Sequence, residues 1–290
     1  MNQKIKGICF VLTAAFCFAL MNTLVKLSGD LPFIQKSFFR NAVACVAATA
    51  VLLRSEEKFR FDKKNLMPLT LRAVLGTISV LGNFYAVDKM LLSDATMLNK
   101  LAPFFAIIFS FFILKEKIKI FQIVAIICAF AGSLLIIKPG FQVAAVMVPA
   151  LIGLFGAMCN GCAYSIVRYL GSKGERGPFI VFYFSAFSCL VVLPFLLLDF
   201  HPMTVGQVVI LLCAGIAAAV GQFAITAAYS CAPAKEISVY DYTQVVFSAL
   251  FGFLFLQQIP DRYSVIGYII ICATSVVMFL INNTARARKM

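Results

Sequence analysis

Residues 93–114, SDATMLNKLAPFFAIIFSFFIL, place a charged side chain inside a long apolar run. After Asp94, the only charged residue in this stretch is Lys100. The run is long enough for an α-helix to cross a hydrocarbon core of about 30 Å. A lysine costs several kcal/mol at the centre of a bilayer and is rare there unless it has a function. The stretch therefore predicts a membrane helix with a functional charge at Lys100.

The rest of the chain shares this apolar character. Of its 290 residues, 62% are hydrophobic and 13% are charged, whereas a soluble domain has about 45–50% apolar and about a quarter charged residues. Apolar runs of membrane-spanning length recur throughout. Ten spans are expected, at about 7–28, 32–53, 66–88, 93–114, 118–137, 145–169, 177–198, 205–230, 235–257 and 263–283. The sequence therefore predicts an all-α integral membrane protein with ten transmembrane helices.

The positive charges predict the orientation of these spans. If the N-terminus is cytoplasmic, 17 of the 25 lysines and arginines fall in inner segments and 5 in outer segments. The other 3, Arg40, Arg72 and Lys100, fall within spans. Because cytoplasmic loops carry an excess of lysine and arginine, both termini are predicted to be cytoplasmic. Since the net charge of +13 is spread over short loops between spans, we expect no nucleic-acid binding.

Two pairs of similar segments indicate an internal duplication. AAFCFALMNTLVKL (14–27) aligns with GAMCNGCAYSIVRY (156–169) at a shift of 142, and residues 103–118 align with 244–259 at a shift of 141. These nearly equal shifts predict two halves of five spans each. The expected halves are residues 1–140 and 141–290, which together form one membrane domain. Because five is odd, the second half would be inverted, as in secondary transporters whose substrate site lies where the halves meet.

The same alignment relates Lys100 to a carboxylate. At the shift of 141, Lys100 corresponds to Asp241, and each is expected roughly 10 Å deep, measured from opposite faces of the membrane. A fixed cation and a fixed anion could bind the carboxylate and ammonium groups of a zwitterion. Asp241 could alternatively carry a coupling proton, or the two residues could form a purely structural pair. We favour a role in function, because ionisable residues within membranes usually have one.

Other polar residues in the spans are candidates for lining a central cavity. Asn22 in the first span corresponds to Tyr164 in the sixth at the shift of 142. The remaining predicted substrate-binding residues are Asn83, Asn99, Gln222, Tyr240 and Tyr242. Their alternative role is interhelical hydrogen bonding, worth roughly 0.6–2 kcal/mol for each bond.

Two further residues in the spans carry specific expectations. Arg40, about eight residues into the second span, could bind an anion or a helix end, or extend toward the outer interface; we favour a structural or gating role between helices. Pro103 has no backbone N–H, so it is expected to loosen the helix beside Lys100.

Several kinds of chemistry lack the residues that they require. Of the ten cysteines, nine lie within expected spans, where they indicate apolar packing rather than disulfides. The pair Cys159 and Cys162 has neither a second cysteine pair nor a nearby histidine to complete a metal site, and the only histidine is His201. The chain contains no P-loop and no HExxH motif. We therefore expect no metal, no cofactor, no direct ATP hydrolysis and no enzymatic activity.

The sequence resembles the drug/metabolite transporter superfamily, EamA type. The resemblance rests on the ten spans in two halves, on APFFAIIFSFFILKEKI (102–118) and on GQFAITAAYSCAPAKEISVYDYTQVVFSALFGFLF (221–255) with SVIGYIIICA (264–273). The second half departs from the family pattern, with Gln244 at the proline position and Gln257 at the glutamate position. The resemblance implies a multi-pass carrier of the bacterial inner membrane that works by alternating access. It also implies a cavity lined by spans one, three, four, six, eight and nine, with spans five and ten peripheral.

The predicted function is export of small polar or zwitterionic metabolites such as amino acids. The alternative is import of a larger organic solute, such as a nucleotide-like or cofactor-like compound. The expected partners are the small-molecule substrate and the lipid bilayer, with protons as the candidate coupling ion. The protein is expected to be a monomer or a weak dimer.

Overall fold

The computed structural model describes residues 3–113, 118–137, 144–231 and 238–287. The described helices are α1 (Gln3–Leu27), α2 (Phe33–Leu53), η1 (Lys63–Asn65), α3 (Leu66–Lys89), α4 (Leu92–Asn99), α5 (Ala102–Ile113), α6 (Ile120–Ile137), α7 (Ala144–Ser172), α8 (Gly177–Leu198), α9 (Val205–Cys231), η2 (Ser238–Tyr242), α11 (Thr243–Leu256) and α12 (Arg262–Ala287). The described part of the chain contains no β-strand.

The lengths of these helices agree with the predicted membrane spans. In the described residues, 9 helical segments are long and apolar enough to cross a membrane, with α4 and α5 counted together as Leu92–Ile113. A shorter apolar segment, Tyr240–Leu256, occupies the place of the ninth predicted span. Large apolar side chains such as Leu198 and Val205 remain exposed on the outside of the bundle, as expected for surfaces that lipid covers. The prediction of an all-α multi-pass membrane protein is confirmed.

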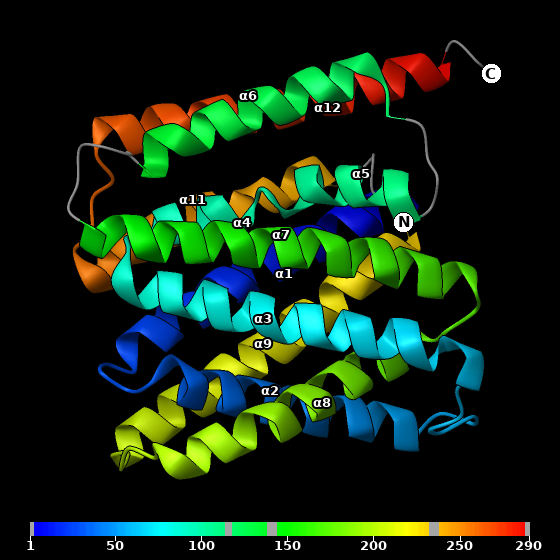
Figure 1. The fold of residues 1–290 in the computed structure, drawn as a ribbon, viewed down its shortest axis with the longest axis vertical. Helices are drawn as coiled ribbons and strands as arrows, with labels where there is room; N and C mark the ends of the chain where they lie inside the picture. The colour runs from blue at the N-terminus through cyan, green and yellow to red at the C-terminus, as the bar shows by residue number, and fades with distance from the viewer. Residues whose placement is uncertain (1–2, 114–117, 138–143, 232–237, 288–290) are drawn as a thin grey trace.

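The helices form an elongated bundle with distinct ends and a centre (Figure 1). The pair α6 and α12 lies at one end of the long axis, and the pair α2 and α8 lies at the other. Between these pairs lie α1, α3, α4, α5, α7, α9 and α11. The fifth and tenth spans, α6 and α12, are therefore peripheral, as the resemblance implied.

Helix contacts between the two halves occur in matching pairs. The contact of α1 with α9 matches that of α3 with α7, and the contact of α5 with α7 matches that of α11 with α1. The pairs α2–α8 and α6–α12 each join the same span of the two halves. This arrangement fits two related halves, while the boundary between residues 140 and 141 stays a prediction.

Corresponding spans run in opposite directions. Along the contact of α4 with α11, the backbone N–H of Leu92 donates to Gln258, and Thr96 donates to Ser248 at 3.0 Å. The residue number thus rises on one helix as it falls on the other, which is the geometry of an inverted repeat. The start of α1 and the end of α12 lie on the same side of the bundle, at the right of the view (Figure 1). Which face of the membrane this is stays a prediction.

Small residues let the peripheral pair pack closely. A Cβ atom added at Gly267 on α12 would lie 2.7 Å from the carbonyl oxygen of Gly132 on α6. Such close backbone approach is typical of helix contacts in membranes. There the hydrophobic effect does not drive association, and small residues let helices associate through van der Waals packing. The α6–α12 pair is therefore held by backbone packing at the edge of the bundle.

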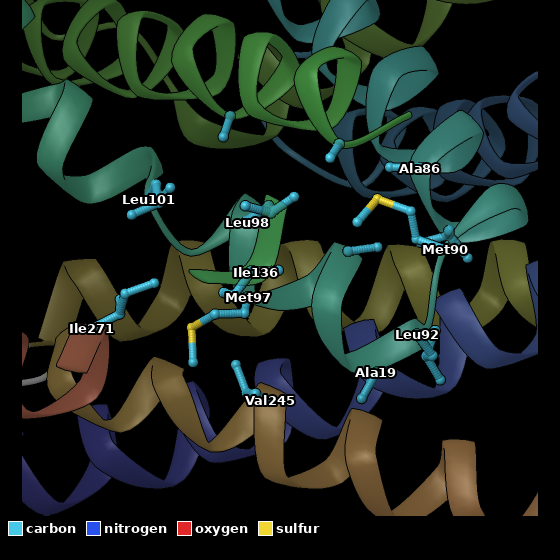
Figure 2. Packing of buried hydrophobic residues seen from close by; sticks show 14 of the residues in the cluster. Ala19, Ala86, Met90, Leu92, Met97, Leu98, Leu101, Ile136, Val245 and Ile271 are labelled. Carbon is cyan, nitrogen blue, oxygen red and sulfur yellow. The ribbon is translucent and has the colours of Figure 1, made fainter. Parts of the chain in front are cut away.

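The main buried cluster surrounds the gap between α4 and α5 (Figure 2). Leu98, in the last turn of α4, and Leu101, within the gap, are completely buried. Val245 of α11 and Ile271 of α12 belong to the same cluster. The apolar packing of both halves thus holds the region around Lys100 in place.

Candidate functional site

The fourth predicted span is not one continuous helix. It stops at Asn99 and resumes at Ala102, and Lys100 lies at the interruption. Pro103 has no N–H to donate and its ring disfavours the preceding helical turn. The N–H of Phe104, which would bond to the Lys100 carbonyl in a regular helix, donates to the Leu101 carbonyl at 3.0 Å instead. The expectation that the helix is loosened beside Pro103 is confirmed.

The ninth span supplies a hydrogen-bond donor to the carbonyl group that this interruption leaves without one. The Tyr242 hydroxyl donates to the freed Lys100 carbonyl at 3.0 Å, and Tyr242 is buried. A neighbouring helix can stabilise an interrupted membrane helix by satisfying the backbone group that the break releases. The two spans therefore support each other at this point.

Lys100 and Asp241 form an ion pair at the centre of the same contact. The distance from Lys100 Nζ to Asp241 Oδ2 is 2.5 Å, and the side chains are 7% and 17% exposed. Asp241 lies in the 3-10 helix η2, directly before α11. Each charge thus sits where a span departs from regular α-helix, at matching places in the two halves. The contact between them is shown, and their role in binding stays a prediction.

Two of the predicted asparagines also meet. Asn83 Nδ2 on α3 donates to Asn22 Oδ1 on α1 at 3.3 Å, and Asn22 is buried. The other predicted lining residues are half-buried: Asn99 beside Lys100, Gln222 on α9 and Tyr240 on η2. The structure therefore gathers part of the predicted set into two hydrogen-bonded groups.

Tyr164 on α7 lies among charged groups from several elements. It is hydrogen-bonded to Asn160 and interacts electrostatically with Asp241, Arg72 and Arg40. These three charges come from η2, α3 and α2, yet Tyr164 is 43% exposed. Tyr164 is therefore partly exposed and lies near charges from three other elements, while its role in lining a cavity stays a prediction.

Arg40 and Arg72 form a buried pair of arginines, and this pairing was not predicted from the sequence. Arg40 on α2 and Arg72 on α3 are 6% and 7% exposed. Both guanidinium groups lie over the ring of Phe184 on α8, with their Cζ atoms 5.6 Å and 4.0 Å from its centroid. The alternative in which Arg40 extends toward the outer interface is wrong, because its side chain is buried. The sequence feature that could have indicated this pair is the presence of a second arginine, Arg72, within a span.

Metal binding finds no support in the described residues. No group of three or more histidine, cysteine, aspartate or glutamate side chains there could hold a metal ion. Cys159 and Cys162 both lie on α7 as free cysteines. The described site is therefore one of charges and amides.

Comparison with known proteins agrees with this picture. The EamA-like transporter family matches residues 5–138 and, separately, residues 147–280. The chain is 31% identical over 274 residues to the pseudopaline exporter CntI of Pseudomonas aeruginosa (strain UCBPP-PA14), covering 94% of this chain and 95% of that protein. It is 25% identical over 298 residues to human solute carrier family 35 member G1, covering 93% of this chain and 78% of that protein.

A solved protein structure shares the fold. It superposes with a TM-score of 0.66 at 15% identity, covering 96% of this chain and 98% of that chain. The family match extends over both halves, and the helices have the length and apolar character of membrane spans. The protein is therefore a multi-pass membrane transporter and not an enzyme, and it belongs to the EamA-like transporter family of the drug/metabolite transporter superfamily.

Proposed function

We propose that this protein is a secondary transporter that exports small zwitterionic metabolites, such as amino acids, across the bacterial inner membrane by alternating access. The observation that carries the proposal is the Lys100–Asp241 ion pair, which joins the two halves at 2.5 Å. The direction is supported by the relative whose name describes an exporter.

The ion pair can be exchanged for a zwitterion without leaving either charge unsatisfied. The carboxylate of the solute would bind Lys100, and its ammonium group would bind Asp241. Removing one partner of a buried pair is costly, because the other charge is left uncompensated. A zwitterion supplies both replacements at once, so it could open the contact between the halves at low cost.

Opening this contact would also affect the backbone. The Tyr242 hydroxyl holds the Lys100 carbonyl, and Tyr242 directly follows Asp241. Separation of the charged side chains would therefore strain the link that supports the α4–α5 interruption. This coupling is how a solute between the halves could bias their relative position, which alternating access requires. A proton on Asp241 would weaken the same ion pair, and this makes protons the candidate coupling ion.

The test is counterflow in proteoliposomes with a panel of labelled amino acids. Lys100→Ala and Asp241→Asn are expected to abolish exchange of every amino acid that the wild type carries. Lys119→Ala is the matched control, because Lys119 is exposed outside the spans, and it should keep wild-type exchange. Wild-type flux in both site variants would overturn the proposal.

Direction needs a separate measurement. Deletion of the gene is expected to raise the intracellular level of the solute that counterflow identifies. A fall in that level would favour the import alternative.

A further inference from the structure

The described bundle buries four cationic side chains, and they divide into two kinds. Lys36 Nζ lies 2.7 Å from Asp88 Oδ1, and Lys100 Nζ lies 2.5 Å from Asp241 Oδ2. Both buried lysines are therefore neutralised. The other two buried cations are Arg40 and Arg72, and within the described residues neither forms an ion pair with a carboxylate.

The arginines also have nitrogen atoms without hydrogen-bond acceptors. Arg40 Nε, Arg72 Nε and Arg72 Nη1 are buried and have no partner within the described structure. Arg40 Nη1 donates to Asn41 Oδ1 at 2.5 Å. A buried donor without an acceptor costs about 1–3 kcal/mol, and more when it is charged. Three such atoms in one place indicate an acceptor that is not part of the described chain.

The electrostatic surroundings of the arginines point to the charge of that acceptor. Arg72 interacts with Tyr164 and, unfavourably, with Arg40. Arg40 interacts with Tyr164 and Cys189. Among the described residues, none of these neighbours is a carboxylate. Two like charges held together in a low-dielectric interior are stabilised only if an anion joins them.

The geometry of the arginines suits an oxyanion. The ring of Phe184 lies under both guanidinium groups, 5.6 Å from Arg40 Cζ and 4.0 Å from Arg72 Cζ. Stacking on an aromatic face fixes the guanidinium plane and leaves its N–H edge for an acceptor. Carboxylate and phosphate groups match that edge with two parallel hydrogen bonds.

The depth of the pair argues against a lipid headgroup as the anion. Arg40 is seven residues from the start of α2, and Arg72 is six residues from the start of α3. At a rise of 1.5 Å per residue, each lies about 10 Å from its helix end. Both positions therefore lie inside the apolar spans Phe33–Leu53 and Lys63–Lys89, away from the span ends beside which headgroups lie.

We propose that Arg40 and Arg72, together with the Tyr164 hydroxyl, form a subsite that binds a carboxylate or phosphate group of the transported solute. This inference rests on the proposed function for the transport of that solute, and it narrows the substrate class. The Lys100–Asp241 pair is neutral in total, whereas the arginine pair carries two positive charges. The preferred solute is therefore a zwitterion with an additional acidic group.

The test is a thermal-shift assay on the purified full-length protein with a thiol-reactive dye. Ten cysteines are present, and those described are free, so unfolding exposes thiols to the dye. The probes are glutarate, its uncharged diamide, inorganic phosphate and phosphatidylglycerol. Glutarate or phosphate should raise the melting temperature at millimolar concentration, because a ligand stabilises the state that it binds. The diamide should not raise it.

Variants connect this response to the arginines. Arg40→Gln and Arg72→Gln should abolish the response to soluble anions. Arg176→Gln is the matched control and should keep it, since Arg176 already pairs with Glu57 at 3.1 Å. If the glutamine variants do not fold, Arg40→Lys and Arg72→Lys retain the charge without the planar fork, and they should weaken apparent affinity about tenfold. An unchanged anion response in these variants would overturn the subsite. An arginine-dependent response to phosphatidylglycerol alone would also overturn it, in favour of a lipid contact.

The two proposals can fail independently. In counterflow, the wild type should prefer glutamate to glutamine, and Arg72→Gln should lose that preference. If Lys100 and Asp241 variants transport normally but the anion response depends on the arginines, the zwitterion site is wrong and the subsite stands. If zwitterion exchange requires Lys100 and Asp241 but the anion response is absent, only the subsite fails.

Discussion

The lysine–aspartate pair and the two arginines are buried charges in one bundle, yet they are built in different ways. Lys100 and Asp241 neutralise each other at 2.5 Å and join the two halves. Arg40 and Arg72 share the ring of Phe184, and three of their buried nitrogen atoms have no acceptor among the described residues. The first arrangement is complete without a ligand, and the second is not. This difference suggests that a solute must separate Lys100 from Asp241 and must also supply the anion that Arg40 and Arg72 lack.

The largest effect is expected when the complete pair loses one member. Lys100→Ala should lower the free energy of unfolding by about 3 kcal/mol, because Asp241 would remain buried without a counterion. The double variant Lys100→Ala/Asp241→Ala should recover much of this loss. Unfolding with sodium dodecyl sulfate in mixed micelles measures the wild type, Lys100→Ala, Asp241→Ala and the double variant. If the double variant is as unstable as the two single losses added together, the pair does not contribute as an ion pair.

The arginine pair should lose less stability than the Lys100–Asp241 pair when one charged side chain is removed. Arg72→Met removes a buried charge that has no carboxylate partner in the described part of the chain, so its cost is limited to the stacking on Phe184, about 0.5–2 kcal/mol. Relief of repulsion from Arg40 acts in the opposite direction. The expected free energy of unfolding lies within about 2 kcal/mol of the wild type. Lys36→Met, measured in the same way, should cost more because it leaves Asp88 unpaired. A loss with Arg72→Met as large as that with Lys100→Ala would show that Arg72 has a counterion.

An effect smaller than that of Lys100→Ala is also expected from the hydroxyl that supports the interrupted helix. Tyr242→Phe keeps the ring but removes the donor to the Lys100 carbonyl, 3.0 Å away in the structure. The free energy of unfolding should fall by about 1–3 kcal/mol, since a buried carbonyl loses its partner. Tyr169→Phe, which keeps a ring beside Lys173, is the control and should be nearly neutral. Equal stabilities of the two variants would contradict a supporting role for Tyr242.

The smallest effect on stability is expected at interhelical hydrogen bonds, where function can still be affected. Asn83→Ala removes the bond to Asn22, and Thr96→Val removes the bond to Ser248. Each should cost roughly 0.6–2 kcal/mol. If Asn83 lines the solute path, only Asn83→Ala should also reduce counterflow. Equal flux through both variants would assign Asn83 a purely structural role.

Much of the fold follows from local properties of the chain. Apolar runs of membrane-spanning length predicted the helices, because a backbone in lipid must satisfy its hydrogen bonds internally. The shift of 141 related Lys100 to Asp241 before any contact was known, and the ion pair confirms that they meet. Pro103 marked the region where the fourth span is interrupted, since the missing N–H is a property of the residue itself.

Other features required the tertiary structure. Most spans are apolar on every face, so the sequence does not indicate how each helix is rotated about its axis. That rotation brings Arg40 of α2 and Arg72 of α3 onto one ring, Phe184 of α8, and places Tyr164 among charges from other helices. It also aims the Tyr242 hydroxyl at a carbonyl of another span. By itself, the sequence determined the spans, the expected duplication and one pair of charges. Only the packing of helices from both halves decided which cations are neutralised and which are left for an anion.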